Sequence, residues 1–376
     1  MKIIVLGCGL VGGPMAADLA KDNSYSVTVA DINGPALEKI KQELRVDTIR
    51  TDLREKSQLQ KLVAGYDMVV SAVPGFMGFE TLKTIIEAGK NVVDIAFFPE
   101  DPFQLDPPAK AKGVAALVDC GVSPGMTSML VGYAYHMLDE VDDALVYVGG
   151  LPQVREWPFE YRAVFSPVDV IEEYTRPARY IENGQLIVRP ALSDPELIFF
   201  PGVGTLEAFN SDGLRTMLQT IKAANMKEKT LRYPGHIEKM TLLRETGFFS
   251  KDEIVVNGVR VRPLDVTAAL MFPQWKLQEG EGDLTILQVK VVGKRDGRTC
   301  GFQYDMLDRY DAATRTISMA RTTGYTATAA VRMLNAGLYK SAGITAPEML
   351  GKHPECVQFL LEDLSKRGVV YRETRL

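Results

Sequence analysis

The sequence of 376 residues predicts an α/β protein. We expect a Rossmann-type doubly wound parallel sheet joined to a central α+β domain with a mainly antiparallel sheet. Three observations predict this architecture. The chain opens with a strand, a glycine-rich turn and a helix; strand and helix patterns then alternate to residue 138; beyond residue 140, short strand-like runs separated by turn signals dominate. Repeated strand–helix units give parallel sheets with right-handed crossovers, whereas successive short strands give antiparallel sheets.

The first unit of this pattern has the features of a dinucleotide site. A β-branched apolar run at 3–6 predicts a buried parallel strand, and it leads into Gly7, Gly9 and Gly12. Gly7 permits a tight turn, Gly9 lets the backbone approach a pyrophosphate, and Gly12 lets the next helix pack closely on the strand. The amino terminus of that helix adds free N–H groups and a positive dipole end, so the turn predicts an anion site.

A second feature supports this interpretation. Residues 27–30 predict the next strand, which ends at Asp31, about 19 residues beyond Gly12, where a ribose-binding acid belongs. An aspartate accepts a hydrogen bond from a ribose 2′-hydroxyl and repels a 2′-phosphate, so NAD is favoured over NADP. The alternative is that Asp31 only caps the loop into the following helix. We predict NAD as the cofactor, bound by Gly7, Gly9, Leu10, Val11, Gly12, Asp31, Ile32, Asp52, Leu53, Ala72, Val73 and Pro74.

The elements after Asp31 continue the alternation. Helical patterns lie at 35–44, 55–63, 80–88 and 124–138, and strand patterns at 46–49, 68–75, 91–94 and 114–118. The run 68–75 ends in a small-residue loop, where dinucleotide folds usually hold the second nucleotide half.

Beyond residue 140 the pattern changes. Strands are expected at 144–148, 161–165, 178–181, 185–188, 285–292 and 301–307, with a hairpin turn at Asn183-Gly184. Helices are expected at 168–174, 213–223, 235–246 and 263–272, and again from 326 onward and at 355–366. We expect the carboxy-terminal helices to fold back on the first domain. An exposed antiparallel sheet often pairs with a second subunit, so a homodimer is expected.

Composition excludes several classes of function. The net charge of −5, without a stripe of basic residues, argues against nucleic acid as a partner. No apolar stretch reaches about 18 residues, so no membrane segment is expected. The four cysteines are far apart and form no C-x-x-C pair, which is typical of a reducing cytoplasm. No paired-histidine spacing occurs, and no metal is predicted.

Five further segments carry a family resemblance. They read Asp119-Cys-Gly-Val-Ser-Pro-Gly-Met126, Val148-Gly-Gly-Leu-Pro-Gln153, Tyr174-Thr-Arg-Pro-Ala-Arg179, Ser211-Asp-Gly-Leu-Arg215 and Thr230-Leu-Arg-Tyr-Pro-Gly-His236. With the glycine motif, they resemble the saccharopine dehydrogenase-like family over nearly the whole chain, most closely its L-lysine 6-dehydrogenase branch. The resemblance implies a discontinuous NAD-binding domain of residues 1–123 and 316–376, a substrate-binding and dimerisation domain of residues 124–315, and NAD(P)-linked chemistry at a carbon–nitrogen bond.

One departure from the family's saccharopine-forming members favours the lysine branch. Those members have a tyrosine-bearing loop and an aspartate before the Pro-Gly pair, where this chain has Ala96-Phe97-Phe98 and Ser123. We therefore favour NAD-dependent oxidative deamination of the L-lysine ε-amine to 2-aminoadipate 6-semialdehyde, which cyclises to piperideine-6-carboxylate, with release of ammonia. Two alternatives stay open. One is a saccharopine or carboxynorspermidine dehydrogenase or reductase that forms or cleaves a secondary amine, and the other is a non-catalytic NAD(H)-sensing protein.

Lysine oxidation requires a base, because hydride leaves the ε-carbon only when the amine has lost its proton. Asp94 and Asp119 each follow a predicted parallel strand, at the edge where open α/β sheets bind ligands, although either could only cap a loop. A histidine at a helix start could be a neutral proton acceptor or a structural residue. Arginines could clamp a substrate carboxylate or form surface salt bridges. We predict catalytic roles for Asp94, Asp119 and His236, and substrate binding by Arg176, Asp212, Arg215 and Arg244. Cys120 is expected to be a packed residue, because hydride chemistry needs no thiolate.

Overall fold

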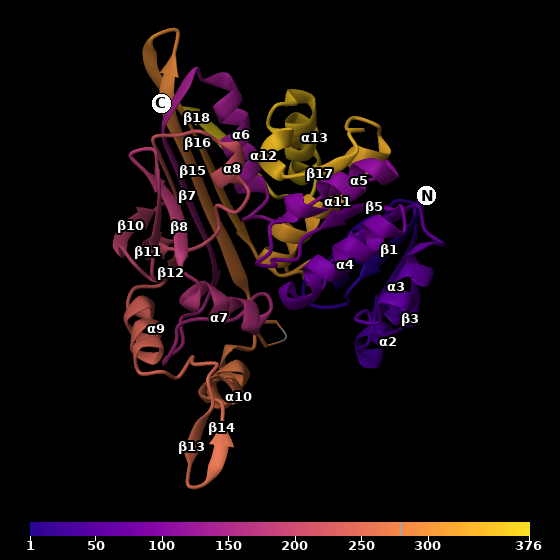
Figure 1. Ribbon diagram of the computed structural model, residues 1–376, viewed down its shortest axis with the longest axis horizontal. Helices are drawn as coiled ribbons and strands as arrows, with labels where there is room; N and C mark the ends of the chain where they lie inside the picture. The colour runs from indigo at the N-terminus through magenta and orange to yellow at the C-terminus, as the bar shows by residue number, and fades with distance from the viewer. Residues whose placement is uncertain (279) are drawn as a thin grey trace. The chain divides into compact units, whose positions relative to one another are not determined.

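A computed structural model describes residues 1–278 and 280–376, and this part of the chain forms two compact units (Figure 1). The first unit contains residues 1–139, 219–221 and 319–371, and the second contains residues 140–218, 222–318 and 372–376. The first boundary therefore falls after residue 139, whereas the predicted domains meet at residue 123. The difference arises because α6 (Met126–Met137) packs on α12 (Pro347–Leu350) of the first unit. A Cβ atom at Gly132 would lie only 2.2 Å from the carbonyl oxygen of Glu348.

The first unit is built on a seven-stranded sheet in the order β17-β6-β5-β4-β1-β2-β3. Every pairing along this order is parallel, which confirms the predicted doubly wound sheet. The seven strands are β1 (Lys2–Leu6), β2 (Ser26–Asp31), β3 (Asp47–Arg50), β4 (Met68–Ser71), β5 (Asn91–Asp94), β6 (Ala115–Leu117) and β17 (Gly343–Thr345).

Helices cover both faces of this sheet. Apolar side chains such as Ile4, Val69 and Val92 pack in one core with Leu82 and Ile85 of α4, while α1 and α11 contact each other and lie on the opposite face. The helices of the first unit are α1 (Gly12–Leu19), α2 (Gly34–Glu43), α3 (Lys56–Val63), α4 (Gly75–Glu87), α5 (Asp106–Lys112), α6, α11 (Tyr325–Asn335), α12 and α13 (Pro354–Ser365). A 3₁₀ turn, Pro102–Leu105, precedes α5, and a π-helical turn, Ala320–Gly324, precedes α11.

Helix α4 begins five residues before the predicted start at 80. The prediction treated the glycines of this stretch as part of a loop. In the structure Gly78 is needed within the helix, because a Cβ there would lie 2.6 Å from the Cβ of Ala96 and 2.8 Å from the ring of Phe98. The glycine thus allows the helix to sit directly on the chain that leaves β5.

The second unit contains a nine-stranded sheet, whose main path is β10-β11-β12-β7-β15-β16-β18, with β8 on β12 and β9 on β8. Only the β12–β7 pairing is parallel among those described, which confirms a mainly antiparallel sheet. Its strands are β7 (Glu140–Pro152), β8 (Ala178–Glu182), β9 (Gln185–Arg189), β10 (Glu196–Phe200), β11 (Gly204–Asn210), β12 (Asn225–Arg232), β15 (Asp283–Arg295), β16 (Arg298–Arg309) and β18 (Arg372–Arg375). Its helices are α7 (Pro167–Thr175), α9 (His236–Glu245) and α10 (Pro263–Trp275).

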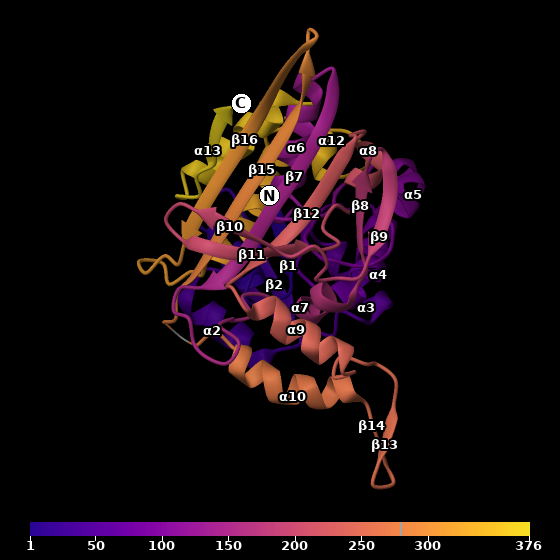
Figure 2. The same cartoon turned by 90° about the vertical axis from the view of Figure 1, so that its left-hand side faces the viewer.

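The predicted hairpin turn between β8 and β9 is confirmed. Asn183 and Gly184 both have positive φ, 50° and 73°, as a two-residue turn between antiparallel strands requires. A second hairpin, β13 (Ile254–Val256) with β14 (Val259–Val261), was not predicted; it extends beyond α10 (Figure 2).

Two predictions in the second unit are wrong. Residues 161–165 form no strand; Tyr161 instead packs against Trp275, and Ala163 makes one isolated bridge to Lys276. The helix expected at 213–223 is the single turn α8 (Met217–Thr220), because residues 211–216 form a buried turn instead. Strand β12 was missed because four of its eight residues are charged, which is a composition typical of exposed chain. In the described residues, no helix is both long and apolar enough to cross a membrane.

Candidate functional site

The glycine turn of the first unit has the geometry that its motif predicts. Gly7 has φ of 106°, which side-chain-bearing residues rarely adopt. A Cβ at Gly12 would lie 2.2 Å from the carbonyl oxygen of Gly7, so only glycine allows α1 to approach β1 this closely. At Gly9 nothing lies within 4 Å of such an atom, and the turn is open there. Val11 precedes α1 and has no side-chain oxygen to cap its N–H groups, which leaves them available to an anion.

Asp31 lies at the end of β2 and is held by the turn itself. Its Oδ2 accepts a hydrogen bond from the backbone N–H of Cys8 at 2.6 Å, and its Oδ1 accepts from that of Asn33 at 2.7 Å. The cap of α2 comes from Asn33, whose side chain accepts from the N–H of Ala36, so Asp31 does not cap this helix. An ionised carboxylate has about four acceptor positions, and those of Asp31 not used by the backbone fit ribose hydroxyls.

The other predicted cofactor residues surround the same end of the sheet. The carbonyl of Ala72 lies 2.6 Å from where a Cβ of Gly7 would be, so the loop after β4 adjoins the glycine turn. Pro74 precedes α4. Leu53 is buried, whereas Asp52 forms an ion pair with Arg54 at 2.6 Å. Leu10 and Ile32 are exposed large apolar side chains, Val11 is half-buried and Val73 is buried. These residues fit a nucleotide laid across the carboxyl ends of β1, β2 and β4.

Asp94 ends β5 and Asp119 follows β6, so both lie at this edge of the sheet. Asp94 is fully buried, and its Oδ1 accepts from the N–H of Ala96 at 3.3 Å. Asp119 is 1% exposed and has φ of 51°. The pKa of the Cys120 thiol is raised well above its usual value, first by burial and then by the charges of Asp119 and Asp94. A thiol that stays protonated is a packed residue rather than a nucleophile, which agrees with the prediction for Cys120.

His236 has a structural position in the second unit. Its ring is 1% exposed, its Nδ1 lies 3.0 Å from the carbonyl oxygen of Phe159, and its Nε2 lies 3.0 Å from the hydroxyl of Tyr174. A carbonyl can only accept, so Nδ1 carries the proton and Nε2 accepts from the tyrosine hydroxyl. Burial, followed by the charge of Arg232, lowers the pKa of His236 to about 3. Both nitrogens are therefore used within the fold, and the catalytic role of His236 stays a prediction.

The predicted substrate-binding residues Arg176, Asp212 and Arg215 do come together. The pKa of Arg176 is lowered by burial; Glu172 and Asp212 oppose this effect, whereas Arg215 and Arg179 add to it. Arg215 is 7% exposed and has φ of 51°. We call Arg176, Arg179 and Arg215 the arginine cluster. Several guanidinium groups in one partly buried place favour an anion with planar oxygens, such as a carboxylate.

Two of the predicted residues are committed to other contacts. Asp212 accepts from Arg179 through both carboxylate oxygens, at 2.8 and 2.9 Å, so its charge serves the cluster itself. Arg244 on α9 donates to the side chain of Glu245 and to the carbonyl of Ala191. Within residues 1–278 and 280–376, no group of three His, Cys, Asp or Glu side chains is arranged to hold a metal ion.

A charged network next to the cluster was not predicted. Arg232 of β12 donates to Glu173 at 2.6 Å and to the hydroxyl of Tyr174 at 3.2 Å. On the same strand, Glu228 accepts from Ser211 at 2.6 Å. The sequence contains one signal for this network, because Glu228, Thr230 and Arg232 recur at every second position, which places them on one face of a strand.

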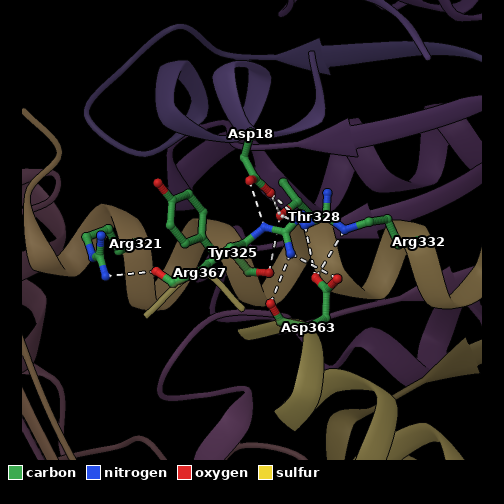
Figure 3. Close-up of polar contacts among 7 residues, drawn as sticks. All are labelled: Asp18, Arg321, Tyr325, Thr328, Arg332, Asp363 and Arg367. Carbon is green, nitrogen blue, oxygen red and sulfur yellow. Dashed lines mark hydrogen bonds and ion pairs between the residues drawn. The ribbon is translucent and has the colours of Figure 1, made fainter. Parts of the chain in front are cut away.

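A second buried network holds the first unit together (Figure 3). Asp18 of α1 accepts from Arg332 of α11 at 2.6 Å and from Arg367 at 2.7 Å. Asp363 of α13 pairs with the same two arginines, at 3.0 and 2.9 Å. Burial opposes the ionisation of Asp18, but Arg332, Thr328 and Arg367 outweigh it and lower its pKa. The charges thus tie the carboxy-terminal helices to the helix that follows the glycine turn.

Comparisons with known proteins agree with this architecture. Residues 3–117 match the family description "Saccharopine dehydrogenase NADP binding domain", and residues 121–369 match "Saccharopine dehydrogenase C-terminal domain". Alpha-aminoadipic semialdehyde synthase from Mus musculus is 25% identical over 70% of this chain, which spans about 30% of the length of that relative. Two relatives match end to end. Saccharopine dehydrogenase [NADP(+), L-glutamate-forming] from Schizosaccharomyces pombe is 24% identical over 99% of this chain and 98% of its own, and carboxyaminopropylagmatine dehydrogenase from Synechocystis sp. is 23% identical over 99% and 97%.

A solved structure confirms the fold. Saccharopine dehydrogenase (L-Glu forming) from Saccharomyces cerevisiae, in its apo form, superimposes with a TM-score of 0.82 at 20% sequence identity, covering 100% of this chain and 99% of the other.

Proposed function

The chain belongs to the saccharopine dehydrogenase family, and on that premise we propose that it is a nicotinamide-dependent dehydrogenase of a carbon–nitrogen bond in an amino-acid-derived amine. The observation that carries this proposal is the first unit's open glycine turn with Asp31 beside it, adjoining an edge where two buried acids follow β5 and β6. When bound, the nicotinamide nucleotide accepts or donates the hydride. The chain's own residues bind the nucleotide, orient the amine and handle protons.

We propose NAD as the nucleotide. The carboxylate of Asp31 is fixed by two backbone N–H groups at the end of β2, where it would accept from a ribose 2′-hydroxyl. A 2′-phosphate at that place would meet a fixed negative charge. The full-length relative from Schizosaccharomyces pombe is described as NADP(+)-dependent, so this chain's preference must be measured directly.

The finer proposal is oxidation of the lysine ε-amine. A base first removes a proton from the ε-ammonium group, and the lone pair then expels hydride from the ε-carbon to give an iminium ion. Water adds to that carbon, and loss of ammonia leaves the 6-semialdehyde, which cyclises on its own α-amine. Asp94 and Asp119 are the candidate bases. The arginine cluster of the second unit is the candidate for the α-carboxylate, because guanidinium groups bind carboxylates through two parallel hydrogen bonds.

A second candidate is a dehydrogenase that forms or cleaves a secondary amine. The two relatives that match end to end support it, since their names describe saccharopine and carboxyaminopropylagmatine as substrates. The hydride step is the same, but the amine carries a second carbon substituent that leaves as an amine instead of ammonia. Such a substrate with additional carboxylates would need more than one arginine clamp.

The test is reduction of NAD and of NADP in parallel, followed by the absorbance of the reduced nicotinamide, with lysine, ornithine, saccharopine and carboxyaminopropylagmatine as substrates. Turnover of lysine with NAD supports the finer proposal, and ammonia must then appear in equal amount. Turnover of a secondary amine alone supports the second candidate. No turnover of any amine by protein that still binds NADH would overturn the dehydrogenase proposal in favour of an NAD(H)-sensing protein.

A further inference from the structure

Glu228 is a buried acid in the middle of β12 that holds the turn 211–216. It is 5% exposed. Its Oε2 accepts from the hydroxyl of Ser211 at 2.6 Å and from the backbone N–H of Gly213 at 3.2 Å, and its own carbonyl accepts from the N–H of Ser211. The contact with the turn is so close that a Cβ at Gly213 would lie 2.5 Å from the carboxylate carbon. The side chain of Glu228 therefore accepts hydrogen bonds from the residues directly before and after Asp212.

The same turn presents the charged part of the arginine cluster. Asp212 holds Arg179 through both carboxylate oxygens, and Arg215 follows with left-handed backbone and a buried side chain. Arg176 is electrostatically coupled to Arg179, Asp212 and Arg215. Moving the turn would thus displace Asp212 and Arg215 together, and the arginine bound to Asp212 with them.

We propose that Glu228 is a positioning residue for recognition of the substrate's carboxylate, because it fixes the turn that carries Asp212 and Arg215. The proposal rests on the function proposed above, in which the arginine cluster binds that carboxylate. Glu228 does not itself touch the ligand, since its Oε2 is engaged by Ser211 and Gly213. A second hydroxyl, that of Thr230, lies 2.7 Å from the hydroxyl of Ser211 and extends the hydrogen bonding along β12.

The charges around Glu228 predict a pH dependence of this positioning. Burial raises the pKa of Glu228 to about 7, the hydrogen bond from Ser211 opposes this, and the negative charges of Glu173 on α7 and Asp212 on the turn add to it. The cations on neighbouring elements are Arg232 on β12, paired with Glu173, and the arginine cluster itself. Below about pH 7 Glu228 takes up a proton, which removes acceptor capacity from the turn. Carboxylate binding should therefore weaken as the pH falls through this value.

The test compares wild type, Glu228→Gln and the control Glu207→Gln, each saturated with NAD. Glu207 lies on the neighbouring strand β11 and accepts from the N–H of Ile237, so the control removes a similar charge away from the turn. KM and kcat are measured for lysine, or the amino acid that the panel identifies, and for 1,5-diaminopentane, which is lysine without its carboxylate. For Glu228→Gln we expect KM for the amino acid to rise on the order of tenfold, as for loss of one charged hydrogen bond. KM for the diamine and kcat should stay within about twofold, and the rise of the wild-type KM below pH 7 should disappear.

An equal rise of KM for the amino acid and the diamine, or no rise for either, would overturn the positioning role. A wild-type enzyme without amine turnover would overturn the proposed function instead. Calorimetric titration of lysine into the NAD-loaded protein then decides the inference separately: weaker binding to Glu228→Gln than to Glu207→Gln supports it, and equal binding or no binding to any variant contradicts it.

Discussion

Asp18→Asn is the substitution with the clearest expected effect on the stability of this chain. The change keeps the shape of the side chain and removes one of two negative charges from the network in Figure 3. The side chain of Asp18 is 1% exposed and accepts from Arg332 and Arg367 within 2.7 Å, and from Thr328 at 2.6 Å. After the substitution, two partly buried arginines share the single charge of Asp363.

The magnitude follows from the burial of the charges. Removing one partner of a buried ion pair leaves an uncompensated charge and costs about 3–5 kcal/mol. Because Arg332 and Arg367 both keep Asp363, we expect the lower part of this range. For a unit of this size, about 2–4 °C is lost per kcal/mol, so a loss of about 3 kcal/mol should lower the unfolding temperature of the first unit by roughly 6–12 °C.

Both tryptophans, Trp157 and Trp275, lie in the second unit, which lets one experiment separate the two units. Hydrogen–deuterium exchange of α1, α11 and α13 should report the loss, while tryptophan fluorescence should report a smaller change in the second unit. The control is Glu87→Gln, which breaks the exposed 2.9 Å pair with Lys56 and should cost less than about 1 kcal/mol. Equal effects of the two substitutions would refute the assignment of a structural role to the buried network.

Three further predictions concern single side chains. Asp31→Ser should raise the ratio of kcat/KM with NADP to kcat/KM with NAD on the order of tenfold to a hundredfold. The substitution removes a charged acceptor and leaves Arg50, the strand partner of Asp31, beside the 2′ position. Adding Arg50→Ala should reverse the gain, and an unchanged ratio would contradict the role of Asp31. His236→Gln should lower the free energy of unfolding by about 1–3 kcal/mol without changing the pH profile of kcat, since a group with a pKa of about 3 does not titrate in the working range; a displaced profile would restore its catalytic role. In the folded protein the pKa of Glu228 lies above its usual value of 4.5. The protonated side chain therefore contributes to the free energy of unfolding in full below pH 4.5, and this contribution is lost as the pH rises through about 7. Denaturant unfolding of wild type against Glu228→Gln should therefore show a relative gain for the variant of up to about 3 kcal/mol between these limits, and parallel pH curves would argue against a raised pKa.

The parts of the fold that could be predicted are those in which local chemistry determines the geometry. The glycine turn is an example, because the close approach at Gly12 and the positive φ at Gly7 exclude every other residue type. Strands β1 and β5 are mostly buried and apolar, and their limits differ from the prediction by at most one residue. Arg176, Asp212 and Arg215, which the sequence predicts as substrate-binding residues, do lie close together, and their binding of substrate stays a prediction.

The features that could not be predicted depend on partners that are distant in the sequence. Burial of Glu228 and Arg232 is possible only because Ser211 and Glu173 supply partners from other elements. Without those partners, the many charged residues of β12 resemble those of an exposed segment. The surroundings of His236 could not be predicted for a related reason, because Tyr174 and Phe159, which contact its ring, come from elsewhere in the chain.

The network around Asp18 also has a consequence for the order in which the chain folds during synthesis. Asp18 and Arg367 are separated by 349 positions, and β17 likewise follows its partner β6 only after most of the second unit. The first unit therefore cannot reach its native state before α11, β17 and α13 have been synthesised, whereas most of the second unit has been synthesised by then. We expect the early strands and α1 to stay partly folded until then, because Asp18 has not yet met Arg332 and Arg367. The first unit should therefore depend on chaperones more than the second unit does. Moving the carboxy-terminal helices ahead of β1 by circular permutation would shorten the time for which the first unit stays partly folded during synthesis.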